Sequence, residues 1–132
     1  MTNALQALLG AKPVAEITET VFIKRLDTDF TVKALSGDDF DKIRAQATER
    51  VKEGKRTVQK VNEEEVARLI IAKATVDPNF ADAQLLKQFG ARDAGDCVQK
   101  ALLAGEITQL QTAILSASGF IEDEDVIDDA KN

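Results

Sequence analysis

Apolar residues recur at intervals of three and four through most of the chain after residue 36, the spacing that gives an α-helix one apolar face. This pattern predicts five helices: residues 37–53, a segment after Asn62 that ends before Asp77, one from Asp82 to Gly90, one from Asp93 to a break at Ala104–Gly105, and a last one that ends at Gly119. Their apolar faces comprise Phe40, Ile43, Ala47 and Val51; Val66, Leu69, Ile70 and Ala74; Leu85, Leu86 and Phe89; Cys97, Val98, Ala101 and Leu102; and Ile107, Leu110, Ile114 and Ala117. We expect these faces to pack together.

Polar residues at the expected helix starts support two of these boundaries. Ser36 followed by Asp39 has the pattern of a capping box, in which each side chain bonds to the backbone N–H of the other residue. Asn62 begins the second helix in a similar way, and the three glutamates after it suit the positive end of a helix. Gly54 suits the end of the first helix because glycine readily adopts the left-handed conformation that closes one.

The period changes to two between Thr18 and Leu35, where β-branched and aromatic residues alternate with polar ones. This alternation predicts a β-hairpin with a turn at residues 27–29, and its apolar side comprises Val21, Ile23, Phe30, Val32 and Ala34. A two-stranded hairpin is not stable alone, so we expect this side to lie on the helices. The predicted fold class is therefore mainly α, an α+β fold in which only this N-terminal β-hairpin interrupts a small bundle of about five helices.

The first residues are predicted to be weakly held. Leu5, Leu8 and Leu9 share one face if they coil into a short helix, but Gly10 and Pro13 stop it within two turns. Such a helix is marginal alone, so we expect a weakly ordered segment over residues 1–18 that either docks on a partner or packs on the domain.

The remaining chain divides into a domain and a tail. Residues 19–120 are predicted to be a single globular domain. Residues 121–132 hold six acids against Lys131, which is typical of a flexible, disordered acidic C-terminal tail. The tail lacks the alternating oxygen ligands and central glycine of a calcium loop, so we do not expect a metal there.

The chain is short and acidic, with 132 residues and a net charge of −6. One domain of this size can form a core without a disulfide or a metal. Its acidic balance argues against general binding of nucleic acid, because a phosphate backbone would be repelled. Neither a secretory signal nor an apolar stretch of the roughly 20 residues that span a bilayer is visible, so we expect no membrane contact.

The missing residue types exclude several chemistries. The sequence has no histidine, which rules out Ser-His-Asp and Cys-His catalysis and removes the commonest zinc ligand. The single cysteine, Cys97, falls on an apolar helix face and is expected to be a small core residue. No phosphate-binding glycine loop and no paired cysteine motif occurs, so we expect no catalytic residue, no metal and no cofactor.

One basic cluster stands near the segment from residue 54 to residue 61, which is predicted to be a connecting loop. The cluster comprises Arg50, Lys52, Lys55, Arg56 and Lys60. It lacks the interleaved aromatic residues typical of nucleic-acid proteins, which favours a solvated connection. Alternatively, it binds an acidic partner, such as the tail of another copy of the chain.

Several segments taken in order resemble the phage tail assembly chaperone family. They are FIKRLDTDFTVKALSGDDFDKIR (22–44), VDPNF (76–80), LLKQFGARDAGDCVQKALLAGEITQLQTAILSASGF (85–120) and the closing AKN. The resemblance covers about residues 21–132 and rests on the ordered combination of these segments.

The resemblance implies an assembly factor in the host (bacterial) cytoplasm and not an enzyme. Members of the family bind the tape measure protein, keep it soluble, help tail tube subunits assemble around it, and are absent from the mature virion. The family also commonly makes a longer second product by ribosomal frameshifting. Here Ala130, Lys131 and Asn132 would suit an A-rich slippery site, and the codons of the gene test this hypothesis.

The sequence offers two candidate partner-binding segments, neither of them marked by a family motif. They are Leu5, Leu8 and Leu9 at the N-terminus, and Glu122, Asp123, Glu124 and Asp125 in the tail. The expected partners are the tape measure protein, the tail tube protein, the longer form of the chain, and a second copy in a homo-oligomer. The competing functions are a structural tail or head-tail connector protein of the particle and an acidic DNA mimic that acts on a host protein.

Overall fold

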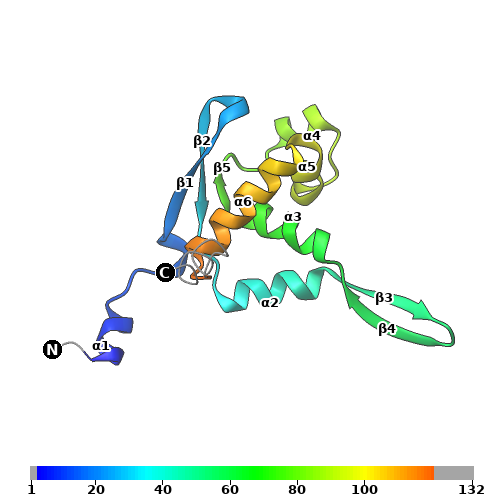
Figure 1. The fold of residues 1–132 in the computed structure, drawn as a ribbon, viewed down its shortest axis with the longest axis horizontal. Helices are drawn as coiled ribbons and strands as arrows, with labels where there is room; N and C mark the ends of the chain where they lie inside the picture. Colours follow the sequence, from blue (N-terminus) through cyan, green and yellow to red (C-terminus); the bar gives the residue numbers. More distant parts are fainter. Residues whose placement is uncertain (1–2, 121–132) are drawn as a thin grey trace, which may run out of the picture.

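The structure, a computed structural model, describes residues 3–120, which fold into a mix of α-helices and β-strands (Figure 1). The predicted α+β class is confirmed, whereas the predicted acidic tail (121–132) lies outside the described residues. The helices are α1 (Ala4–Leu9), α2 (Gly37–Gln46), α3 (Glu63–Ala74), α4 (Ala83–Phe89), α5 (Ala94–Ala101) and α6 (Ala104–Ala117), with 3₁₀ turns η1 (Val14–Glu16) and η2 (Lys24–Leu26). The strands are β1 (Thr18–Ile23), β2 (Thr28–Lys33), β3 (Thr48–Glu53), β4 (Arg56–Val61) and β5 (Thr75–Asp77).

Strands β1, β2 and β5 form an antiparallel sheet in that order. Val21 pairs with Phe30 across the first two strands, and the alternation buries Val21, Ile23, Phe30 and Val32 on the helical side. Phe22, which lies between two buried residues, is 51% exposed on the outer face. The turn comes earlier than predicted: η2 precedes Asp27, whose left-handed φ of 50° sends the chain directly into β2. Aspartate tolerates that conformation better than most residues.

Strand β5 corrects the prediction that one hairpin would be the only β-structure. Its Thr75 pairs with Val32 and its Asp77 with Thr31, which completes the sheet on the far side of β2. Three residues that follow a helix directly are too few to show a period of two, so the sequence pattern did not reveal this strand. Phe80 then packs edge-on against Phe30, with ring centroids 6.2 Å apart.

The predicted helix over residues 37–53 is wrong beyond Gln46, where α2 ends. Residues 48–61, of which 54–61 were predicted as a loop, form a second antiparallel hairpin, β3–β4, in which Val51 faces Val58. Its two-residue turn contains Gly54 at a φ of +62°, a conformation that tight hairpin turns require. The backbone N–H of Asn62 donates to the carbonyl of Ala47 at 2.8 Å, which closes the base of the hairpin.

Most helices begin at the predicted polar caps. The capping box of α2 is confirmed, because the Asp39 N–H donates to Ser36 Oγ at 3.2 Å and the Ser36 N–H to Asp39 Oδ2 at 2.9 Å. Asn62 caps α3 by accepting a backbone N–H at 3.1 Å. The predicted break or bend at Ala104–Gly105 lies two residues earlier: α5 ends at Ala101, and α6 already begins at Ala104.

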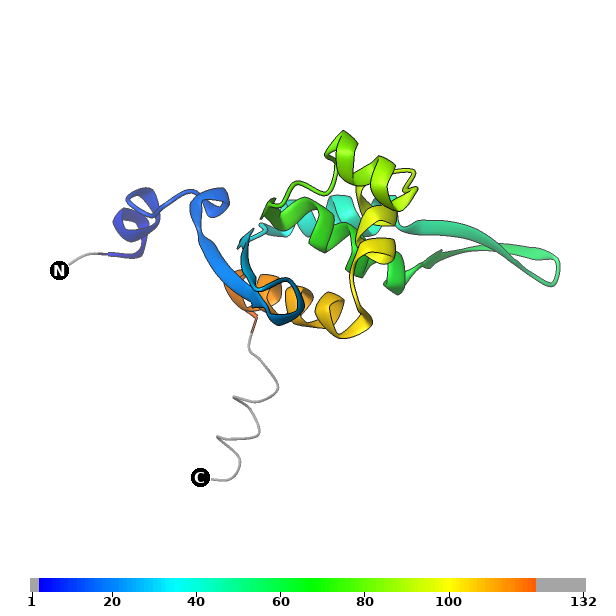
Figure 2. The same cartoon turned by 90° about the horizontal axis from the view of Figure 1, so that it is seen from above.

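The core lies between the inner face of the sheet and helices α3, α5 and α6, with α6 beside β1 and against α3 (Figure 2). Its fully buried members are Ile23, Ile71, Leu110, Ile114, Val32, Val98 and Cys97. Cys97 is thus a core residue as expected, and burial raises the pKa of its thiol. Phe89 was expected to point inward, but it is 39% exposed at the last position of α4.

Candidate partner-binding surfaces

Helix α1 presents the three N-terminal leucines to solvent. Asn3 caps the helix by accepting the N–H of Gln6 at 2.8 Å, and Gly10 ends it. No residue of α1 is buried, and Leu5, Leu8 and Leu9 are 66%, 77% and 77% exposed. Figure 1 shows α1 standing away from the sheet and the other helices. The structure therefore brings the three leucines together on one short helix, and their binding of a partner stays a prediction.

The second predicted segment, from Glu122 to Asp125, lies outside the described residues. It follows Phe120, whose ring packs edge-on against that of Phe40 in α2, with ring centroids 5.6 Å apart. The role of these four acids stays a prediction.

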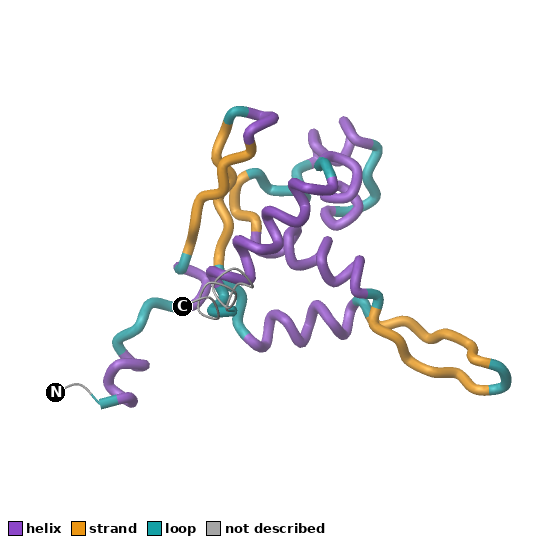
Figure 3. Tube along the Cα trace, viewed as in Figure 1, coloured by secondary structure: helices purple, strands orange, loops and turns teal. Residues whose placement is uncertain are grey.

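The β3–β4 hairpin is a surface that sequence reasoning missed. It extends beyond the end of α2 as a two-stranded ribbon (Figure 3), and no residue in either strand is buried. Sequence analysis located its basic residues but assigned them to a helix end and a loop. The signal that could have found the ribbon is Gly54–Lys55 between two segments with β-branched residues, the pattern of a two-residue hairpin turn.

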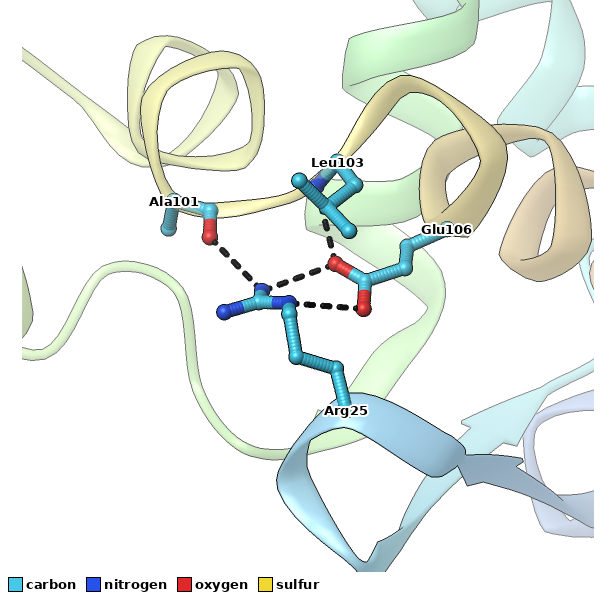
Figure 4. A network of polar contacts seen from close by, with 4 residues as sticks. All are labelled: Arg25, Ala101, Leu103 and Glu106. Carbon is cyan, nitrogen blue, oxygen red and sulfur yellow. Dashed lines mark hydrogen bonds and ion pairs between the residues drawn. The ribbon is translucent and has the colours of Figure 1, made fainter.

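A bidentate ion pair joins the tip of the β1–β2 hairpin to the start of α6 (Figure 4). Arg25 Nε donates to Glu106 Oε2 at 2.9 Å, and Arg25 Nη2 donates to Oε1 at 2.8 Å. The same Nη2 reaches the carbonyl of Ala101 at 3.2 Å, while the Leu103 N–H donates to Oε1 at 2.8 Å. These contacts anchor the hairpin where α5 passes into α6.

The electrostatics of this junction stabilise the charged carboxylate. The hydrogen bond from Arg25 is the main cause that holds the pKa of the Glu106 carboxyl below its ordinary value. Burial opposes this shift, and the N–H of Leu103 adds to it. The pair raises the pKa of the Arg25 guanidinium in turn. Both charged groups are hydrogen-bonded within the chain, so we assign the junction a structural role.

Exposed apolar side chains adjoin the same junction. Leu26 follows Arg25 in the chain and is 44% exposed, and Leu103 at the start of α6 is 56% exposed. Gln109 Nε2 donates to the carbonyl of Phe22 at 2.8 Å, which also ties α6 to β1 near these residues. The exposure of Leu103 was not predicted from periodicity, because Leu103 lies between two helices.

A shallow groove of about 390 Å³ lies where α3 meets the start of α5. Its lining residues are Gln46, Glu65, Arg68, Leu69, Ala72, Arg92, Asp93, Ala94, Gly95, Asp96 and Gln99. Two of its carboxylates are engaged in the fold: Asp93 caps α5, and Asp96 accepts the N–H of Arg92 and pairs with Lys100 Nζ at 3.0 Å. The bond from the Arg92 backbone is the main cause that lowers the pKa of Asp96.

Two observations concern metal and thiol chemistry in the described part of the chain. Within residues 3–120, no three or more His, Cys, Asp or Glu side chains gather where they could hold a metal ion. The buried Cys97 thiol, with its raised pKa, is a poor source of thiolate. In the same part of the chain, the helices are all too short or too polar to cross a bilayer.

A crystal structure titled for the protein yqbn has a similar fold. It aligns with a TM-score of 0.65 over 92% of this chain and 100% of that chain, at 17% sequence identity. A likeness at this identity concerns the fold alone.

A family model described as phage XkdN-like tail assembly chaperone protein matches residues 5–131. The chain belongs to this family of phage tail assembly chaperones. The resemblance drawn from residues 21–132 is therefore confirmed. No curated protein sequence matches this tail assembly chaperone.

The family match includes every candidate surface of the tail assembly chaperone. It begins at Leu5 in α1, runs through the β3–β4 hairpin, and extends past Asp125. Membership supports a role in tail assembly and suggests a protein that works by binding rather than by catalysis.

Proposed function

We propose that this tail assembly chaperone binds the tape measure protein of its phage in the host cytoplasm. It keeps that protein soluble, promotes assembly of tail tube subunits around it, and leaves before the particle is complete. The family membership supports the assembly role. The exposed leucine face of α1 is the main observation that supports the proposed binding of the tape measure protein.

An uncovered apolar helix face favours a helical partner. The three leucines of α1 occupy positions that an amphipathic helix uses to pack against another helix, and no part of the described chain buries them. A tape measure protein is long and largely helical, so its own apolar positions need cover until the tube encloses them. Contacts between such faces remove apolar surface from water on both partners.

The contact is expected to be moderate in strength and repeated. The sequence has no Trp and no Tyr, the side chains that most often anchor a tight interface. Many weak contacts along one long partner still hold it firmly, because each bound copy adds to the total. Individual copies can then be displaced as tube subunits arrive.

Co-expression with the tape measure protein from the same gene cluster tests the proposal. The gene should keep any overlapping downstream frame, so that a longer frameshifted product is also made. We expect the tape measure protein to become soluble and to co-purify with the chaperone. A tape measure protein that stays insoluble and unbound under these conditions would overturn the proposed function.

A leucine variant tests the binding face. Replacing Leu5, Leu8 and Leu9 with alanine should leave the thermal unfolding midpoint unchanged, since none of them is buried, but should reduce capture at least about tenfold. The matched control carries Phe22→Ala, Val76→Ala and Leu103→Ala, which removes exposed apolar surface from the body instead.

The two variants separate the possible outcomes. Loss of capture in the leucine variant alone supports α1 as the binding element. Loss of capture in the control alone would indicate that the interface lies on the body of the protein. This result would contradict the role of α1 but not the chaperone function. Mass spectrometry of purified virions addresses the competing function, because a structural connector protein would be present in them and an assembly factor would be absent.

A further inference from the structure

The β3–β4 hairpin contributes no buried residue to the core, yet it is regular along its whole length. Its strands pair without a bulge from Thr48 opposite Val61 to Glu53 opposite Arg56. Figures 1 and 2 both show it extending away from the packed helices. A two-stranded ribbon gains little stability by itself, so both of its faces are available for contact with another molecule.

The two faces of the ribbon differ in charge. Because side chains alternate along a strand, one face carries Glu49 opposite Lys60 and Glu53 opposite Arg56, with a pair of valines between them. Lys60 Nζ also lies 3.1 Å from Glu53 Oε1. Charges on this face are therefore balanced within the hairpin.

The other face is uniformly positive. Arg50 stands opposite Gln59, and Lys52 stands opposite Thr57, so neither cation has an acidic cross-strand neighbour. Lys55 adds a third positive charge at the turn. None of the ion pairs found among residues 3–120 involves these three cations. We call Arg50, Lys52 and Lys55 the basic face.

The same chain carries a segment of opposite charge. Residues 121–132 have a net charge of −5, whereas the first 120 residues together have a net charge of only −1. Four of the acids are consecutive, from Glu122 to Asp125. This segment is the strongest concentration of negative charge in the protein and therefore the best electrostatic match for the basic face.

Chain geometry prevents this acidic run from reaching the hairpin tip of its own copy. Phe120 lies against Phe40, so even a fully extended chain carries Asp125 only about 17 Å from that point. The path from Phe40 to Lys55 runs about 9 Å along the rest of α2 and roughly 30 Å along β3 and its turn. Figures 1 and 2 show α2 and the hairpin continuing in the same general direction. A second copy has no such restriction.

We propose that the basic face of the β3–β4 hairpin binds the acidic segment from Glu122 to Asp125 of a second copy of the chain. Each copy then offers one hairpin and one acidic segment, so the contact joins two different surfaces. Reciprocal exchange between two copies gives a closed dimer, and exchange that passes on to further copies gives rings or open chains. This self-association does not depend on the tape measure protein and goes beyond the proposed function.

Sedimentation velocity at two ionic strengths tests the proposal. Exposed charges are screened over roughly 20 Å at about 0.02 M salt and over about 4 Å at about 0.5 M salt. We expect the full-length wild-type protein to form oligomers at low salt and to dissociate at high salt. A monomer at low salt would overturn the proposal.

Charge reversal on the hairpin locates the contact. A hairpin variant with Arg50→Glu, Lys52→Glu and Lys55→Glu should lose the association at low salt. The control variant carries the same change in net charge at three exposed cations elsewhere, Lys12→Glu, Lys24→Glu and Lys87→Glu. The control should associate with an affinity within about threefold of that of the wild type. Its charge changes lie away from the basic face, and net charge alone has little effect on the affinity of this contact. Equal association by the hairpin variant and the wild type would overturn the proposal.

A mixing experiment tests the pairing itself. A tail variant, with each of residues 122–125 replaced by lysine, should also fail to associate alone. Mixed with the hairpin variant, however, it should restore oligomers, because the reversed hairpin now meets a reversed tail. Circular dichroism checks that all variants remain folded. Failure of the mixture to associate would overturn the proposal.

A nucleic-acid assay tests whether the basic face binds a phosphate backbone instead of the acidic segment. The wild type and the hairpin variant are each titrated with a labelled duplex DNA at low salt. Binding by the wild type that the hairpin variant loses, together with self-association that the variant keeps, would assign the basic face to nucleic acid and overturn the proposal.

Discussion

Arg25 and Glu106 lie 81 residues apart in the sequence, yet the guanidinium of one holds the carboxylate of the other through two hydrogen bonds of 2.9 and 2.8 Å. Glu106 also accepts the N–H of Leu103 at the start of α6, so one carboxylate both caps a helix and anchors a hairpin. Its side chain is only 10% exposed, and that of Arg25 is 41% exposed. The orientation of the β1–β2 hairpin on the helices therefore depends partly on this pair.

Glu106→Ala should destabilise the protein. The change removes a helix-capping bond, which is worth about 1 kcal/mol by itself, and leaves Arg25 without its partner. Urea denaturation followed by circular dichroism measures the loss. A double-mutant cycle with Arg25→Ala should show favourable coupling between the two residues, and strictly additive losses would contradict the role given to the pair.

Acid should weaken the protein through the same carboxyl. The pKa of Glu106 is lowered in the folded state, so its contribution to the free energy of unfolding is present above the ordinary glutamate range and is lost as the pH falls through the folded value. We therefore expect stability to decline below about pH 4.3. In Glu106→Gln the free energy of unfolding should fall less steeply as the pH is lowered. The difference in free energy of unfolding between this variant and the wild type should be largest at neutral pH. A constant deficit at every pH would show that the charge of Glu106 is unimportant.

Neighbouring residues on β1 should respond very differently to truncation. Ile23 is fully buried, so Ile23→Ala should cost about 2–5 kcal/mol through lost burial and an internal cavity. Phe22 faces away from the core and is 51% exposed, so Phe22→Ala should cost less than about 1 kcal/mol. Equilibrium denaturation compares the two, and similar losses would mean that the sheet does not pack through the predicted face.

Two glycines should give changes of opposite sign when replaced by alanine. Gly105 is in α6 with open space where a Cβ would lie, so Gly105→Ala should stabilise the protein by about 0.5 kcal/mol. Gly90 ends α4 at a φ of +62°, a left-handed conformation, so Gly90→Ala should destabilise it by about 1 kcal/mol. Thermal unfolding midpoints measure both. Stabilisation by Gly90→Ala would contradict the helix end described for α4.

The candidate surfaces show how far sequence reasoning extends. The leucines of α1 could be located because Asn3 and Gly10 bound the helix within a few residues of them. The basic residues of the hairpin could be named but not arranged, since their division into a balanced and a positive face depends on cross-strand register. The Arg25–Glu106 junction could not be anticipated, because no local pattern relates two residues so distant in the chain.

The features that the sequence determined by itself depend on residues that are close together in the chain. The capping box of Ser36 and Asp39 and the buried alternation of Val21 and Ile23 both follow from bonds or periods within a few positions. Tertiary structure decided that α2 ends at Gln46, because Val51 fits both a helical face and a strand, and none of the residues of β3 and β4 is buried in the core. It also decided that Thr75 begins a strand, since a segment of three residues becomes a strand only when an edge such as that of β2 is there to receive its hydrogen bonds.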